Sequence, residues 1–166
     1  LLAEKGWPVR VALYGAVDAL KGDAAWAAGQ WLQLCRDRQV PDQDAIAALE
    51  HVAMDDVGLV VDALFGAGLA RGLDDTCRAA LARVQQLPCP VVAVDVPSGV
   101  WGDSGQADGA VACDLTVTFF RKKPAHCLYP GRALCGQVVV ADIGIEPSVL
   151  PALNVQTFEN MPSLWL

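Results

Sequence analysis

The stretch VVAVDVPSGVWGDSG at residues 91–105 decides the fold of this 166-residue chain. Within it, PVVAVDVPSG (90–99) is an apolar run that ends in Asp95 and a turn containing glycine. A run of this kind is typical of a strand that is buried on both faces of a sheet. VGLVVDALFGAG (57–68) has the same form, with Asp62 ahead of a glycine-rich turn. DLTVTFF (114–120) and QVVVADIG (137–144) predict two further strands of this kind.

Helical patterns separate these strands. AAWAAGQWLQLCRDR (24–38) predicts a helix with Asp23 as its N-cap, and 74–87 predicts another, with apolar positions at Ala79, Leu81, Ala82 and Val84. We also expect a short strand over 9–15, a short helix over 42–50 and, in LLAEKGW (1–7), the end of a helix closed by Gly6. Alternating strands and helices predict an α/β fold with a mostly parallel sheet.

Composition disfavours several classes of protein. The net charge is −7 and the only basic cluster is Arg121-Lys122-Lys123, which is typical of a solvated loop, so we expect no nucleic-acid partner. No run approaches the roughly 20 apolar residues of a membrane helix, so we expect no membrane partner. The six cysteines include no C-x-x-C pair, which favours reduced thiols in the cytoplasm over zinc or disulfides.

Polar residues stand where the predicted strands end. Ligands of open α/β sheets bind beyond the carboxyl ends of the strands, so Asp62 and Asp95 share one crevice if their strands are neighbours. A single aspartate there is better explained as a turn former or a helix cap. Two of them, each leading into a glycine turn, favour a ligand site. Asp62 and Ser98 also offer hard oxygens, which suit alkali or alkaline-earth ions.

The turn after Asp62 has features of an anion-binding loop. GAGLARG (66–72) departs from G-x-G-x-x-G because Arg71 stands at the third glycine. Gly66 and Gly68 let backbone amides approach an anion, and Arg71 suits a phosphate. A loop that simply needs positive φ at glycine explains the pattern equally well. Ser98 lacks the G-x-S-x-G context of a hydrolase nucleophile, and a structural role is favoured for His126.

Six segments taken together resemble the successive motifs of the NAD(P)H-hydrate epimerase family, which includes the animal apolipoprotein A-I-binding protein. They are LKGDAAWAA (20–28), VVDALFGAGLAR (60–71), VVAVDVPSGVWGDSG (91–105), DLTVTF (114–119), KKPAHCLYPGRALCG (122–136) and VVVADIGI (138–145). The resemblance implies a three-layer αβα Rossmann-like epimerase domain over 1–146. It also implies that 147–166 is a linker toward a C-terminal dehydratase domain.

The resemblance implies an isomerase of cofactor repair, which interconverts the 6R and 6S forms of hydrated NADH and NADPH in the cytoplasm. It implies that Asp62 and Ser98 bind a potassium ion and that Asp95 binds substrate, with acid/base work at the nicotinamide ring as our hypothesis for Asp95. The implied substrate-binding loop consists of Gly66, Ala67, Gly68, Leu69, Ala70, Arg71 and Gly72. A homodimer and a fused dehydratase domain remain open as partners.

One departure from the family concerns the beginning of the chain. The family carries an Asn-Asn-Gly-Gly-Asp-Gly loop, with a potassium-ligating Asn, before the helix in which this chain starts. We therefore expect an N-terminally truncated domain that is weakly stable or inactive as it stands. A non-catalytic nucleotide- or protein-binding module is the alternative function. An NAD-dependent dehydrogenase is disfavoured by the incomplete glycine fingerprint.

Overall fold

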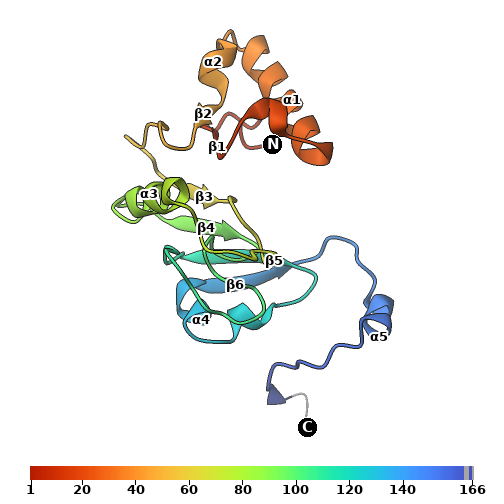
Figure 1. Cartoon of the computed structure of the whole chain (residues 1–166). Helices are drawn as coiled ribbons and strands as arrows, with labels where there is room; N and C mark the ends of the chain where they lie inside the picture. The colour runs from red at the N-terminus through yellow and green to blue at the C-terminus, as the bar shows by residue number, and fades with distance from the viewer. Residues whose placement is uncertain (163–164, 166) are drawn as a thin grey trace. The chain divides into compact units, whose positions relative to one another are not determined.

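The computed structural model describes residues 1–162 and 165, which form two compact units (Figure 1). One unit, here called unit 1, comprises residues 1–56 and 74–80. The other, unit 2, comprises 57–73 and 81–166. Each contains a parallel sheet with helices in the connections, so the predicted α/β class with parallel strands is confirmed.

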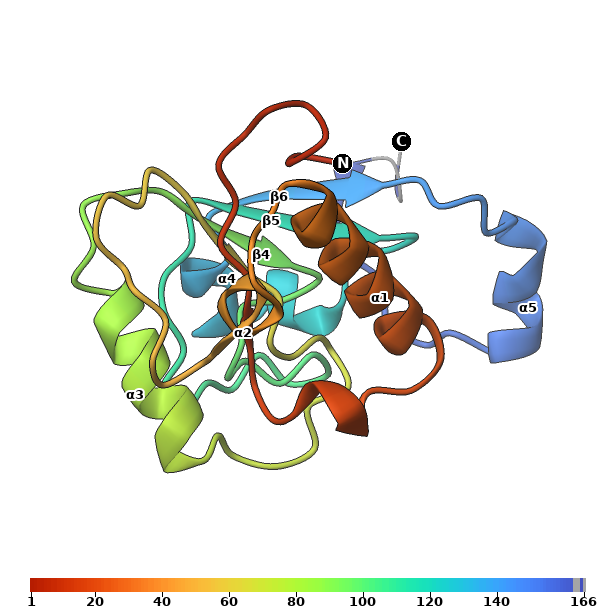
Figure 2. The same cartoon turned by 90° about the horizontal axis from the view of Figure 1, so that it is seen from above.

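Unit 2 contains the four strands that the apolar runs predict. All pair in parallel, in the order β3-β4-β5-β6, and Figure 2 shows β4, β5 and β6 side by side. The strands are shorter than the runs because each run continues into a turn. Their bounds are Val60–Asp62 for β3, Val91–Val94 for β4, Leu115–Phe119 for β5 and Gln137–Ala141 for β6.

Alternate side chains along β4 and β5 are buried inside unit 2. Val91 and Ala93 of β4 are 5% and 0% exposed, and Thr116 and Thr118 of β5 are fully buried. Buried hydroxyl groups need partners. Thr116 therefore donates to the Cys135 carbonyl at 2.7 Å, while Thr118 turns its hydroxyl toward the ends of the strands.

Helix α3 (Asp75–Val84) crosses the boundary between the two units. Its buried residues recur at helical spacing, and they are Cys77, Ala80, Leu81 and Val84. The prediction of apolar positions was right for Leu81 and Val84 and wrong for Ala79 and Ala82, which are exposed. Alanine is small enough to lie on either the buried or the exposed face of a helix. The residue type therefore could not show which face Ala79 and Ala82 occupy.

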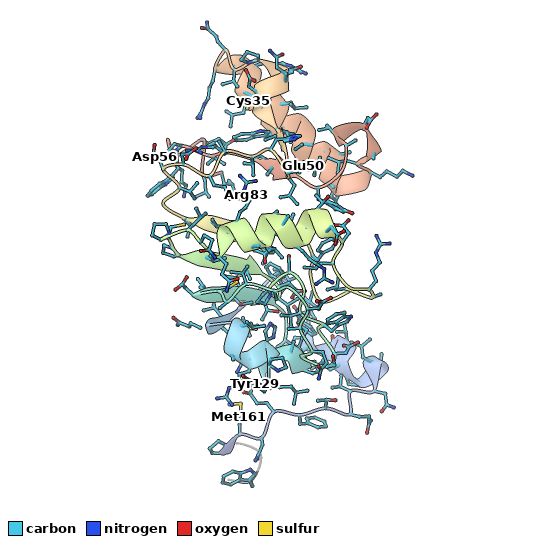
Figure 3. The ribbon with its side chains drawn as sticks, turned by 60° about the vertical axis from the view of Figure 1, so that its left-hand side comes forward. Cys35, Glu50, Asp56, Arg83, Tyr129 and Met161 are labelled. Carbon is cyan, nitrogen blue, oxygen red and sulfur yellow. The ribbon has the colours of Figure 1, made fainter. Side chains whose placement is uncertain are left out.

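Unit 1 contains a two-stranded parallel sheet, β1 (Ala12–Leu13) with β2 (Ala47–Ala48), and the helices α1 (Gly22–Asp37) and α2 (Asp42–Ala45). Buried Cys35 lies on α1 (Figure 3). The N-cap of α1 is Lys21 rather than the predicted Asp23, which instead lies in the first turn. A carboxylate in the first turn interacts favourably with the positive end of the helix dipole. Asp23 therefore still indicates the start of the helix, although it lies two residues after the N-cap.

The predicted helix over 42–50 is wrong beyond Ala45. Residues 47–48 leave the helix and pair with β1, through Ala47 N–H to the Val11 carbonyl at 2.9 Å and Leu49 N–H to the Leu13 carbonyl at 3.0 Å. The alanines favour a helix locally, but pairing with a distant strand overrides that preference.

The short elements of unit 2 follow the sheet strands. They are the 3-10 turns η2 (Pro124–His126) and η3 (Pro147–Val149) and the helices α4 (Gly131–Leu134) and α5 (Leu150–Leu153). The stretch from 147 onward is thus partly helical, and its assignment as a linker stays a prediction. Across residues 1–162 and 165, no helix combines the length and the apolar character needed to cross a membrane.

The N-terminal turn has the geometry of a helix end. Gly6 has φ +87°, its N–H donates to the Ala3 carbonyl, and the Trp7 N–H donates to the Leu2 carbonyl. These two bonds form a Schellman motif, in which a glycine in left-handed geometry closes a helical turn. The predicted role of Gly6 is confirmed.

Candidate active site

The two predicted carboxylates lie at the same edge of the sheet in unit 2. Asp62 is the last residue of β3, and Asp95 directly follows β4. The two strands are neighbours in parallel register, with Asp62 paired to Ala93, so the expected adjacency of these strand ends is confirmed. The segments that follow the strands interlock, because residues between Asp62 and Ala67 contact both Ser98 and Asp95.

Asp62 and Ser98 form a buried pair. The Ser98 hydroxyl donates to Asp62 Oδ1 at 2.5 Å, and the Ser98 N–H donates to Asp62 Oδ2 at 2.8 Å. The Phe65 N–H donates to the Ser98 Oγ at 3.0 Å. Asp62 is 4% exposed and Ser98 is fully buried, so these bonds replace the water that both groups lose on folding.

The oxygen atoms of this pair are of the kind that suits hard cations, alkali or alkaline-earth. In the described part of the chain, no three side chains of His, Cys, Asp or Glu gather as metal ligands. A cation bound by Asp62 would therefore take its other oxygen ligands from hydroxyl and carbonyl groups. Ser98 Oγ and the Phe65 carbonyl oxygen, which lie 3.4 Å apart, are two such groups. Neutral oxygens with one carboxylate suit an alkali ion better than zinc.

Asp95 is held by donors from three segments. Its Oδ2 accepts the Ala67 N–H at 3.0 Å, and its Oδ1 accepts the Thr118 hydroxyl at 2.9 Å and lies 2.6 Å from Lys123 Nζ. Its φ is +73°, a left-handed conformation that aspartate tolerates better than most residues. Burial raises the Asp95 pKa, but the hydrogen bond from Lys123 and those from Ala67 and Thr118 outweigh it, so the pKa lies below its ordinary value.

Thr118 and Lys123 are functional candidates that sequence reasoning missed. Thr118 lies in the correctly predicted third strand. Lys123 belongs to the basic stretch that predicted a solvated loop or a neighbour of a phosphate, and not a partner of Asp95. The alternation of β5 places Thr116 and Thr118 on one face, which is the signal that pointed to the strand end. Nothing local in Arg121-Lys122-Lys123 distinguishes the one lysine that turns toward Asp95.

His126 connects the main chains of Asp95 and Lys123. Its Nδ1 accepts the Lys123 N–H at 2.9 Å, so Nε2 carries the proton and donates to the Asp95 carbonyl at 2.8 Å. Burial is the main reason why the His126 pKa lies below its ordinary value. Both ring nitrogens are used by the backbone, in agreement with the structural role expected for this residue.

The beginning of the predicted substrate loop lies against Asp95. Gly66 approaches so closely that a Cβ there would stand 3.2 Å from Asp95 Oδ2, and Ala67 supplies the N–H bond. Across the described residues, no hydrogen bond joins the rest of this loop to Asp95. The rest of the loop is residues 68–72. Leu69 is half-buried, and the other four residues are exposed: Gly68, Ala70, Arg71 and Gly72.

The third strand-end aspartate takes no part in the site. Asp142 follows β6 and accepts the Gly144 N–H at 2.8 Å, so it forms its own turn. A hollow of about 350 Å³ lies nearby, at the ends of β5 and β6, and neither Asp62 nor Asp95 lines it. The candidate site therefore consists of Asp95, its contacts and its glycine turn, and this hollow is not part of it.

Comparison with known proteins identifies relatives of the chain. Residues 1–125 match the family model described as YjeF-related protein N-terminus. An NAD(P)H-hydrate epimerase of Roseobacter litoralis is 36% identical, over 87% of this chain and 68% of its own length. The NAD(P)H-hydrate epimerase of Limosilactobacillus fermentum is 38% identical over 66% and 50%, and the bifunctional NAD(P)H-hydrate repair enzyme Nnr of Thermofilum pendens is 36% identical over 97% and 31%. The chain thus spans half or less of two of these relatives.

A solved structure shares the fold. The crystal structure of the yeast protein YNL200c superposes with a TM-score of 0.65 at 17% identity, over 96% of this chain and 65% of that one. The family match covers most of the chain, and the relatives agree with it. The chain therefore belongs to the family of YjeF-related N-terminal domains, and two of the relatives named above carry the NAD(P)H-hydrate epimerase name.

Proposed function

We propose that this YjeF-related chain is an isomerase that interconverts the two epimers of hydrated NADH and NADPH, with Asp95 as its acid/base group. The observation that carries the proposal is the Asp95 carboxylate, fixed by three donors beside a glycine turn at the carboxyl end of the sheet. The names of the Roseobacter and Limosilactobacillus relatives supply the reaction. The strand-end position supplies the place where a nucleotide binds in such folds.

The reaction needs a group that exchanges a proton reversibly. Epimerisation requires one bond at the hydrated ring carbon to break and to re-form from the opposite face. Moving a proton from the hydroxyl group on that carbon, and later returning it, assists both steps without any net oxidation or reduction. Asp95 suits this task because its depressed pKa keeps it ionised, and therefore able to accept a proton, at neutral pH.

Potassium is part of the proposal. Asp62 and Ser98 would hold the ion with their oxygen atoms, aided by carbonyl groups such as that of Phe65. The bound ion would supply positive charge at the end of β3, next to the loop that we expect to meet the substrate phosphates.

The proposal also assigns a setting to the reaction. The Thermofilum relative is named as bifunctional, and we propose that this chain supplies the epimerase activity of such a pair. Free thiols such as Cys113 and Cys135 suit the reducing cytoplasm.

The first prediction tests Asp95 directly. Asp95→Asn keeps the size of the side chain but removes its ability to accept a proton, so we expect kcat/KM to fall by about 10²-fold or more. Turnover is measured by chromatographic separation of the two epimers of hydrated NADPH, starting from one pure epimer and subtracting the spontaneous rate.

Asp142→Asn is the matched control, because Asp142 also follows a strand, but its carboxylate accepts the Gly144 N–H and does not contact Asp95 in the described residues. We expect it to retain wild-type turnover. Wild-type turnover in Asp95→Asn would overturn the assigned role of Asp95. Binding of hydrated NADPH without turnover in the wild-type protein would instead favour the alternative of a non-catalytic binding module.

A further inference from the structure

The two carboxylate oxygens of Asp95 have different surroundings. Oδ1 has two partners, Lys123 Nζ at 2.6 Å and the Thr118 hydroxyl at 2.9 Å. Oδ2 has one protein partner in the described chain, the Ala67 N–H at 3.0 Å. A carboxylate oxygen accepts about two hydrogen bonds. Oδ1 is therefore fully occupied, while Oδ2 keeps one lone pair for a ligand.

The ammonium group of Lys123 is also fully occupied. Besides Asp95 Oδ1, its Nζ lies 2.8 Å from Thr118 Oγ1 and 3.2 Å from the Phe119 carbonyl. A lysine ammonium has three N–H donors, and these three oxygens account for all of them. Lys123 thus has no donor left for a substrate while this arrangement holds, so it acts on the substrate only through Asp95.

The backbone of this pair is fixed as well as its side chains. The His126 ring accepts the Lys123 N–H and donates to the Asp95 carbonyl, at 2.9 and 2.8 Å. The Lys123 side chain is 25% exposed and that of Asp95 is 19% exposed, so water screens the pair only in part. Lys123 and Asp95 are therefore held together at both the main chain and the side chain.

We propose that Lys123 is the positioning residue of Asp95, and that Oδ2 is the oxygen that exchanges a proton with the substrate hydroxyl. This inference rests on the proposed function. As the proton moves from the hydroxyl to Oδ2, a carbonyl group forms at the hydrated ring carbon, the bond from this carbon to the ring nitrogen breaks, and its electron pair stays on the nitrogen. When the nitrogen attacks the opposite face of the carbonyl group, that bond re-forms and the proton returns from Oδ2 to the oxygen. Lys123 occupies Oδ1 throughout, which stops the carboxylate from turning and keeps it ionised between turnovers.

The charge balance of the site supports this role. Burial raises the Asp95 pKa, and the hydrogen bonds from Lys123, Ala67 and Thr118 lower it. Without Lys123, only the bonds from Ala67 and Thr118 would oppose the effect of burial. The Asp95 pKa should then rise. This consequence can be measured on the protein alone, without any substrate.

Lys123→Met tests the inference, because it keeps the aliphatic stem and removes the charge. We expect the carboxyl ¹³C signal of Asp95, assigned by its loss in Asp95→Asn, to titrate at a higher pH than in the wild-type protein. The matched control is Lys122→Met, since the neighbouring Lys122 pairs with Glu159 at 2.9 Å instead. It should leave the Asp95 titration unchanged. An unchanged titration in Lys123→Met would overturn the inference.

Turnover supplies the second measurement. A misplaced reacting group can reduce the rate by about 100-fold, so we expect Lys123→Met to lower kcat by up to this factor with a smaller change in KM. The acidic limb of its kcat/KM profile should move to higher pH. Lys123→Arg, which restores a positive charge, should return the Asp95 titration toward the wild-type value. It also provides the test if Lys123→Met fails to fold, as judged by circular dichroism.

Failure of this inference is distinguishable from failure of the proposed function. If Asp95→Asn is inactive and Lys123→Met has wild-type kcat and a wild-type pH profile, Asp95 acts without Lys123 and the inference is wrong. If Asp95→Asn retains turnover, the assigned role of Asp95 is wrong, whatever Lys123→Met does.

Discussion

Ser98 combines two kinds of hydrogen bond at a fully buried position. Its hydroxyl donates to the Asp62 carboxylate and accepts the Phe65 N–H, so it links the ends of β3 and β4. A hydrogen bond to a charged group contributes more than one between neutral groups, and an unmatched buried donor is costly. The serine is therefore important for stability, whether or not an ion is bound.

We predict that Ser98→Ala destabilises unit 2. The change leaves the Phe65 N–H without its acceptor and removes the shortest bond to Asp62, so we expect a loss of about 1.5–3 kcal/mol in the free energy of unfolding. The measurement is urea unfolding followed through the NMR signals of the β4 and β5 amides. Ser104→Ala is the control, because the exposed Ser104 hydroxyl only accepts a local N–H at 3.3 Å. It should change stability by less than about 0.5 kcal/mol.

The same proteins test the potassium proposal. Wild-type protein should be more stable in potassium chloride than in sodium chloride of equal ionic strength, because a ligand that binds only the folded state stabilises it. Ser98→Ala should lose that difference, and Ser104→Ala should keep it. Equal stability of the wild-type protein in the two salts would contradict potassium binding.

At the scale of elements, the positions of the sheet strands were the most predictable feature. Each of the four apolar runs contains a strand of unit 2. The expected burial on both faces was wrong for β3 and β6, which stand at the two ends of the strand order and expose Val61, Val139 and Val140. Asp62 and Asp95 could be placed because each of them ends one of these apolar runs. Ala47–Ala48 could not be predicted as a strand, because its pairing with β1 depends on residues far away in the sequence. Lys123 was missed for a similar reason, since its partner lies 28 residues earlier.

Glycine at the start of β6 shows how strongly an element can depend on one backbone position. Gly136 has φ +59°, and a Cβ there would stand 2.3 Å from the Cys113 carbonyl oxygen and 2.4 Å from that of Asp114. Both obstacles are backbone atoms next to β5, so a side chain could not be accommodated by a change of rotamer. The approach of β6 to β5 therefore requires glycine at this point.

We predict that Gly136→Ala weakens the pairing of β5 and β6. Strain from the left-handed conformation and the overlap together should lower the free energy of unfolding by about 3 kcal/mol or more. Gly58→Ala is the control, because this exposed glycine of unit 2 has open space around its Cβ position, and we expect a change of less than about 1 kcal/mol. Hydrogen exchange of the β5 and β6 amides measures both. Equal protection in the two variants would show that β6 tolerates a side chain at this position.

On the scale of the whole molecule, the chain is acidic, and its one basic cluster serves separate contacts. Arg121 lies over the Phe120 ring, Lys122 pairs with Glu159 and Lys123 pairs with Asp95. The three side chains of this cluster therefore do not form one shared basic surface. Together with burial, the charges of Lys123 and Lys122 lower the pKa of His126, and this pKa makes the stability of the fold depend on pH.

The dependence on pH follows from His126. Burial lowers its pKa below the ordinary value of 6.5, and the Lys123 and Lys122 charges lower it further, against the raising effects of the Asp95 carbonyl and carboxylate. Below about pH 6.5 the unfolded chain thus binds a proton that the folded chain does not. Stability is therefore complete above that pH and declines as the pH falls toward the folded pKa. The Asp95 contribution is also lost on acidification, but only below its ordinary value of 3.8.

We predict that the free energy of unfolding falls between about pH 7.5 and pH 5.5, and that His126→Gln removes most of this slope. The glutamine does not titrate, so folded and unfolded chains bind equal numbers of protons there. His51→Gln, which changes the exposed histidine of unit 1, should keep the wild-type slope. Urea unfolding of all three proteins, followed through the β4 and β5 amides, provides the comparison. The slope of His126→Gln decides the matter, not its absolute stability, since the variant also loses hydrogen bonds. If that slope equals the wild-type slope, another group causes the acid sensitivity and His126 is not the neutral link between Asp95 and Lys123.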